Sequence, residues 1–187
     1  MKTILTFSLV LLFTLAACSN DEQPPIEPET PHQAFISNLT SLCGETFVGA
    51  STYPDNPEHA LVDTELRAHI SQCEEGLVHV DLYRDGDTWH ATWIVSVKDN
   101  GLHLYHDHIG TKEYPEGEEP LTGYGGFADD RGSEFIQYFP ADESTAEMLP
   151  EASTNEWRME MDLQNGIFVY GLERHNEPRF RAELYLN

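Results

Sequence analysis

The sequence predicts a mainly β fold: an antiparallel up-and-down β-barrel of the lipocalin-like kind, with one N-terminal helix. Successive stretches alternate apolar and polar residues, and hairpin-type turns separate several of them. Helical patterns do not alternate with these strands, so a parallel sheet built from βαβ units is not expected. Sequential antiparallel strands with one plugging helix fit an up-and-down barrel, and a β-sandwich is the alternative.

The expected helix opens the folded domain. Thr30 can act as its N-cap, Pro31 occupies the first helical position, and Gln33 can complete a capping box. Gly44 can adopt the left-handed conformation that ends many helices. An apolar face that should plug or flank the sheet recurs at helical spacing in Phe35, Leu39 and Leu42.

The remaining elements follow from alternation and turn residues. Type I′ turns are expected at Asn100-Gly101 and Asn165-Gly166, with Asp85-Gly86 as a third candidate. One short helix is expected within residues 140–152. Strands are expected at residues 65–72, 76–83, 88–97, 101–109, 134–139, 157–163, 166–174 and 179–186, with two short ones near 46–51 and 121–126.

The N-terminus has the pattern of a secretory signal peptide, expected to span residues 1–17. Lys2 precedes an apolar run that closes on Leu-Ala-Ala-Cys at residues 15–18. This ending resembles the lipobox of bacterial lipoproteins, which implies cleavage before Cys18 and lipidation of that cysteine. Several acyl chains would anchor the protein stably to a membrane.

Residues 18–30 combine prolines and carboxylates with little apolar content, which predicts a disordered tether. Residues 31–187 then form a single domain of a size that can bury a real core. Ser19 follows the lipidated position, and the sorting rule of such lipoproteins implies export to the outer membrane. The expected location is therefore the cell envelope, on the periplasmic or the surface face.

Charge and cysteines limit the partners. The formal net charge of −23 argues against nucleic acid, which needs a basic surface, and leaves the lipid as the only expected contact with a membrane. Once Cys18 carries lipid, Cys43 and Cys73 remain in an oxidising compartment, where a disulfide is the expected state. Neither cysteine has the close partner of a zinc motif.

Several short motifs occur together in a fixed order. They are LCGETFVG (42–49), a histidine shortly before a cysteine (His69 and Cys73), HDH (106–108), YGG (124–126), FPAD (139–142) and NEWRME (155–160). On these motifs the chain resembles a family of uncharacterised bacterial secreted proteins and lipoproteins. The resemblance covers the folded domain and implies no activity.

The stretch GLHLYHDHIG (101–110) contains the main chemical candidates. Side chains alternate along a strand, so His106 and His108 should share the inward face of Leu102 and Leu104, while His103 points away. Two such histidines can bind a divalent transition metal when a third ligand is present, although hydrogen bonding is their commoner role. No cofactor is therefore the main expectation, and the possible third ligands are Glu134, Glu160 and His69.

Aromatic residues offer a second kind of site, because Trp89, Trp93 and Tyr124 could line a ligand cavity, although filling the core of a small barrel is the commoner role of such side chains. No nucleophile elbow, cysteine–histidine signature or phosphate-binding loop is present in the sequence, so a non-enzymatic role is favoured without being settled. The expected function is a lipid-anchored envelope barrel that binds a small ligand or an envelope partner. The alternatives are a metal-binding protein or metal-dependent enzyme that uses His106 and His108, and a purely structural envelope protein.

Overall fold

A computed structural model describes residues 29–54, 56, 58–59, 61–108 and 122–187, and we name its elements first. The helices are α1 (Pro31–Ser41) and α2 (Glu143–Met148), followed by the 3-10 turn η1 (Pro150–Ala152). The strands are β1 (Thr46–Tyr53), β2 (Leu66–Glu74), β3 (Leu77–Arg84), β4 (Thr88–Lys98), β5 (Gly101–Asp107), β6 (Tyr124–Phe127), β7 (Ile136–Pro140), β8 (Asn155–Asp162), β9 (Ile167–Arg174) and β10 (Glu177–Leu186).

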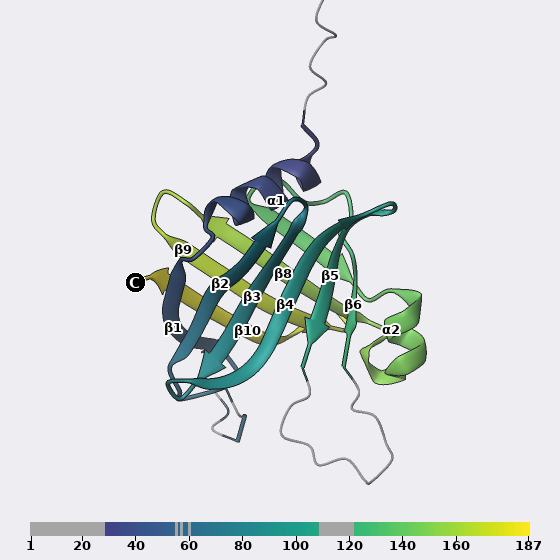
Figure 1. Cartoon of the computed structure of the whole chain (residues 1–187). Coiled ribbons are helices and arrows are strands. Elements are labelled where there is room, and N and C mark those ends of the chain that lie inside the picture. Colours follow the sequence, from purple (N-terminus) through teal and green to yellow (C-terminus); the bar gives the residue numbers. More distant parts are fainter. Residues whose placement is uncertain (1–28, 55, 57, 60, 109–121) are drawn as a thin grey trace, which may run out of the picture.

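All of these strands belong to one antiparallel sheet, which curls into a nearly closed barrel (Figure 1). The strand order is β6-β5-β4-β3-β2-β1-β10-β9-β8-β7, so neighbours in the sheet are neighbours in sequence except where β1 meets β10. This confirms the predicted antiparallel barrel. Because β1 and β10 pair directly, the two halves form one sheet, not the two separate sheets of a sandwich.

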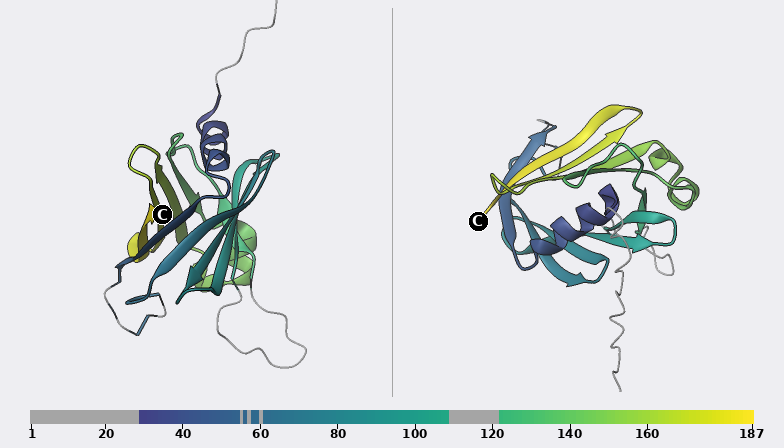
Figure 2. Two further views of the ribbon diagram at one scale, coloured as in Figure 1. Left: turned by 60° about the vertical axis from the view of Figure 1, so that its left-hand side comes forward. Right: turned by 90° about the horizontal axis from the view of Figure 1, so that it is seen from above.

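Helix α1 lies across one end of the barrel, as the view along the barrel shows (Figure 2). The predicted capping box is present, with the Thr30 side chain accepting from the Gln33 backbone and the Gln33 side chain accepting from the Thr30 backbone. Phe35 and Leu39 are fully buried, so the apolar face closes this end of the core. Among the described residues, no helix is long and apolar enough to cross a membrane.

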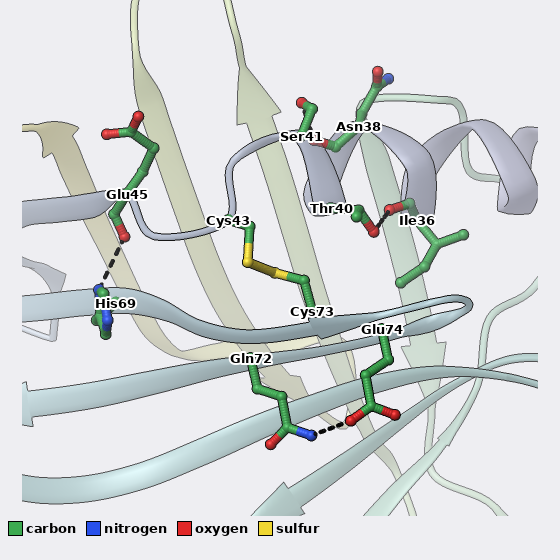
Figure 3. Close-up of a disulfide and its surroundings, with 10 residues drawn as sticks. All are labelled: Ile36, Asn38, Thr40, Ser41, Cys43, Glu45, His69, Gln72, Cys73 and Glu74. Carbon is green, nitrogen blue, oxygen red and sulfur yellow. Dashed lines mark hydrogen bonds between the residues drawn. A yellow bond between two sulfur atoms is a disulfide. The ribbon is translucent and has the colours of Figure 1, made fainter.

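A disulfide fastens α1 to the sheet. Cys43 lies two residues after the end of α1 and is bonded to Cys73 on β2, with their Cα atoms 6.1 Å apart (Figure 3). Gly44 has a φ of 85°, the left-handed conformation expected where the chain leaves the helix. The covalent link and the buried helix face therefore hold the same end of the barrel.

Two of the turn predictions are wrong. A type I′ turn needs positive φ at both central residues, but Asn100 and Asn165 are not among the described residues with positive φ. At Asn165, both the backbone N–H and the side-chain amide donate to Asp162, which builds a longer turn. The third predicted turn, Asp85-Gly86, does have positive φ at both residues, and so does His175-Asn176, which joins β9 to β10.

The barrel closes imperfectly between β6 and β7, the two ends of the sheet. Backbone hydrogen bonds from Asp129 to Tyr138 (3.1 Å) and from Asp142 to Gly125 (3.0 Å) bridge this seam. Thr145 of α2 is fully buried, and its hydroxyl accepts from the Gly125 N–H (2.7 Å) and donates to the Gly125 carbonyl (2.8 Å). The helix therefore satisfies part of a strand edge that would otherwise be open to pairing with another chain.

Candidate functional site

The site predicted around His106 and His108 lies in a cavity of about 410 Å³. Strand β5 begins near α1, where Gly101 lies close to His32, and runs away from it, so the cavity is at the end opposite α1 (Figure 1). Its wall comes from the ends of β3, β5 and β9, the starts of β4, β6 and β10, and the loop between β1 and β2. Its histidines are His59, His90, His106 and His108, and its aromatic residues are Trp93, Tyr124, Tyr170 and Phe180.

The predicted inward direction of His106 and His108 agrees with their place in the cavity wall. The Nδ1 atom of His108 lies 2.9 Å from the Tyr124 hydroxyl, and that of His106 lies 3.5 Å from the Tyr170 hydroxyl. The Nε2 atoms of both rings are buried and have no hydrogen-bond partner within the described part of the chain. Each histidine is thus oriented through one nitrogen and keeps the other unused.

A β-bulge brings His90 into the same cavity. Leu82 pairs with Ala91 but Tyr83 pairs with Trp89, so His90 is an extra residue on β4. The bulge reverses the alternation that the sequence predicts at this point. Trp89, expected to line the cavity, is instead 39% exposed and absent from the cavity wall, whereas the ring of His90 lies 4.5 Å from that of His108.

Burial keeps these side chains uncharged. Burial, together with the nearby His108, Arg84 and His59, lowers the pKa of His90 to about 4. Burial also lowers the pKa of His106 well below its ordinary value and lowers that of His108. The pKa of Tyr170 is raised well above its ordinary value, again by burial. At neutral pH the imidazoles of His90, His106 and His108 are therefore neutral.

Acidification of the metal-free protein, kept in chelator, should destabilise the fold as pH falls from 6.5 towards 4. Well above pH 6.5, His90, His106 and His108 are neutral in both the folded and the unfolded state. Below it the unfolded chain binds protons that the folded protein does not, because burial lowers the pKa of these three side chains. Urea unfolding midpoints between pH 7.5 and pH 5 measure this loss. The matched variant His90→Phe should show a shallower pH dependence, and an unchanged slope would contradict this assignment.

The other candidate ligands lie elsewhere. Glu134 is exposed, and its backbone carbonyl accepts from Asn38 of α1, so the prediction that it joins His106 and His108 is wrong. Glu160 forms an ion pair with Arg158 on the outer face of β8. His69 lies on the outer face of β2 with its Nδ1 3.0 Å from the Thr46 hydroxyl.

His103 points away from the cavity, as the alternation predicts. Its Nδ1 accepts from Lys98 (3.1 Å), and its Nε2–H faces an Asp142 carboxylate oxygen (3.3 Å) at the start of α2. With a partner on each nitrogen, it is a structural histidine that ties β5 to α2.

A larger hollow, of about 810 Å³, lies between α1 and the β2–β3 hairpin. It is more open to solvent, and Glu29, Glu74 and Glu75 line it together with Cys73. Its lining, within the part of the chain that the structure describes, contains no aromatic ring and no histidine. We place the candidate site in the smaller cavity because only that one gathers unpaired polar atoms on apolar walls.

Four of the described cavity residues were not predicted from the sequence: the histidines His59 and His90 and the aromatic residues Tyr170 and Phe180. Tyr170 and Phe180 sit on inward faces that alternation could have found, whereas His90 depends on the bulge and His59 on a loop. His59 stacks on Phe180 at 5.6 Å and accepts at Nδ1 from the Leu61 N–H (3.2 Å).

The arrangement as a whole is a largely aromatic and apolar cavity with a few inward nitrogen atoms and the acidic residue Glu58 in its wall. Among the described residues, no three His, Cys, Asp or Glu side chains are arranged in a group that could hold a metal ion. Comparisons with protein-family models, with curated proteins and with solved structures found no match.

Proposed function

We propose that the chain is a lipid-anchored protein of the cell envelope whose barrel binds a small, largely apolar ligand in the His106/His108 cavity. The cavity itself is the observation that carries the proposal. Its volume of about 410 Å³ falls within the range of roughly 300–1,000 Å³ that is usual for small-molecule sites. A purely structural barrel would fill this space with side chains, as this one does around Trp157 and Phe168.

The walls favour a flat, uncharged molecule. Trp93 and Tyr170 stack with ring centroids 3.9 Å apart, and Phe180 continues this surface at 6.3 Å from Tyr170. Aromatic faces bind flat apolar groups well, and a few inward polar atoms can fix their orientation. Because burial keeps His90 and His106 neutral at neutral pH, the ligand needs no charge to match these two rings.

The proposed anchor is compatible with an accessible cavity. Cys18 and the tether precede α1 in the sequence, and α1 lies at the end of the barrel opposite the cavity. A lipid on Cys18 would therefore attach the protein at the far end and leave the cavity mouth free.

The neutral dye N-phenyl-1-naphthylamine tests the binding function on the full chain extracted from membranes in detergent. We expect its fluorescence to rise on binding to one site per chain. Leu172→Trp fills the cavity and should weaken binding by at least about tenfold. The matched variant Val97→Trp, at a position that is 51% exposed and outside the cavity, should bind normally.

The fold of each variant is checked by circular dichroism, and Leu61→Trp replaces Leu172→Trp if the latter does not fold. Absence of saturable binding, or equal binding by the filled and control variants, would reject the cavity as the site. The mass of the same preparation tests the anchor: a mature chain that begins at Cys18 and carries acyl groups supports it, and an unmodified chain refutes it.

A further inference from the structure

Two buried nitrogen atoms without partners suggest a more specific ligand. The Nε2 atoms of His106 and His108 are both buried and unpaired within the described residues. Buried polar atoms in proteins nearly always have a partner, so each exception calls for an explanation such as a bound water or ion. His106 lies on β5 and His108 is the first residue after that strand; both line one cavity, which points to a common occupant.

The opposite nitrogens of these rings are held in the way that metal-binding histidines are held. In such sites the second ring nitrogen is hydrogen-bonded, which fixes the orientation of the ring and frees the first nitrogen for the metal. Here Tyr124 lies 2.9 Å from Nδ1 of His108, and Tyr170 lies 3.5 Å from Nδ1 of His106. Trp93 further confines His106 by an edge contact with ring centroids 6.2 Å apart.

His90 provides the third ligand that the two-histidine motif lacks. Its ring centroid lies 4.5 Å from that of His108, and the ring of His106 lies 5.5 Å from that of His108. Three imidazoles on one tetrahedral zinc ion, with Zn–N bonds of about 2.1 Å, have ring centroids about 5 Å apart. The ring of His108 therefore lies at about the separation that a shared ion requires from each of the other two rings.

We propose that His90, His106 and His108 bind one divalent transition-metal ion, of which Zn²⁺ is the type case, with a fourth position open to the cavity. The proposal rests on the cavity of the proposed function but not on its organic ligand. As the rings lie, they form no finished coordination group, so His90 must turn its ring towards the other two. Its position on a bulge, only partly buried, allows this rotation.

Cobalt and zinc titrations test the site on the full chain, purified without a polyhistidine tag and stripped with chelator. We expect one Co²⁺ per chain, with the visible absorption of tetrahedral cobalt, and its displacement by Zn²⁺. Each of His90→Phe, His106→Phe and His108→Phe should weaken binding by at least about 100-fold. His79→Phe, on the outer face of β3, is the matched control and should bind normally.

A positioning role for Tyr124 gives an independent check, because Tyr124→Phe should weaken metal binding about tenfold while all three ligands remain. Binding of less than about one-tenth of an equivalent of either metal would overturn the proposal. Normal binding by a folded His90→Phe variant would equally overturn the three-histidine site. Dye binding that persists in the histidine variants separates failure here from failure of the proposed ligand-binding function.

Discussion

Replacement of Trp157 by alanine is expected to lower the free energy of unfolding by about 3–5 kcal/mol, the usual cost of removing a buried tryptophan. Trp157 on β8 is fully buried and stacks on Tyr124 with ring centroids 5.9 Å apart. Tyr124 in turn lies within hydrogen-bond distance of His108. The cavity left by the missing ring should therefore also loosen the candidate site. Urea unfolding, followed by circular dichroism, measures the loss.

Two matched variants define what this result means. Trp157→Phe keeps an aromatic ring and should cost clearly less than the alanine variant. Trp89→Ala removes a tryptophan that is 39% exposed, whose indole N–H donates to the Thr92 hydroxyl, and should cost only about 1 kcal/mol. If Trp157→Ala lowered the free energy of unfolding no more than Trp89→Ala, the conclusion that Trp157 packs in the core would be rejected.

Reduction of the Cys43–Cys73 disulfide is expected to cost about 3–4 kcal/mol of folding stability on the chain-entropy model. The bond closes a loop with a sequence separation of 30 residues, and it holds α1 against the end of the barrel (Figure 3). Urea unfolding midpoints with and without reductant measure the effect, and alkylation followed by mass measurement establishes that both thiols were opened.

The double variant Cys43→Ala/Cys73→Ala serves as the control for this experiment. It should unfold at the lower midpoint under both conditions, because it has no bond for the reductant to break. An unchanged midpoint for the natural chain after complete reduction would show that burial of Phe35 and Leu39 alone holds the helix in place.

Local sequence patterns predicted the fold well because most neighbouring strands of the barrel are also consecutive in the chain. The capping box of α1, the strands and the inward direction of His106 and His108 all depend on residues close in sequence. Asn165-Gly166 shows the limit of such patterns, since the side chain of Asp162 binds the Asn165 backbone and extends the turn beyond two residues.

The candidate site was predicted only in part, for two physical reasons. His90 is an extra residue on β4, so the side chains before it point to the opposite face from the one that alternation predicts. Trp89 therefore points outward, although it was predicted to point into the barrel. Glu134 has no sequence feature that tells which end of the barrel it occupies, and its contact with Asn38 places it beside α1. Both errors concern where a side chain lies in three dimensions, which a local sequence pattern does not determine.

Pairing of the first strand with the last has a consequence for how the protein is made. Phe47 on β1 is aligned with Leu186 on β10, near the two ends of the folded chain. Contacts between such distant residues form slowly, because a long loop must close before they contribute stability. The barrel therefore cannot close until the last strand has been synthesised. If the chain crosses a membrane unfolded, as we propose for a lipoprotein, this late closure would favour export by keeping the incomplete chain unfolded.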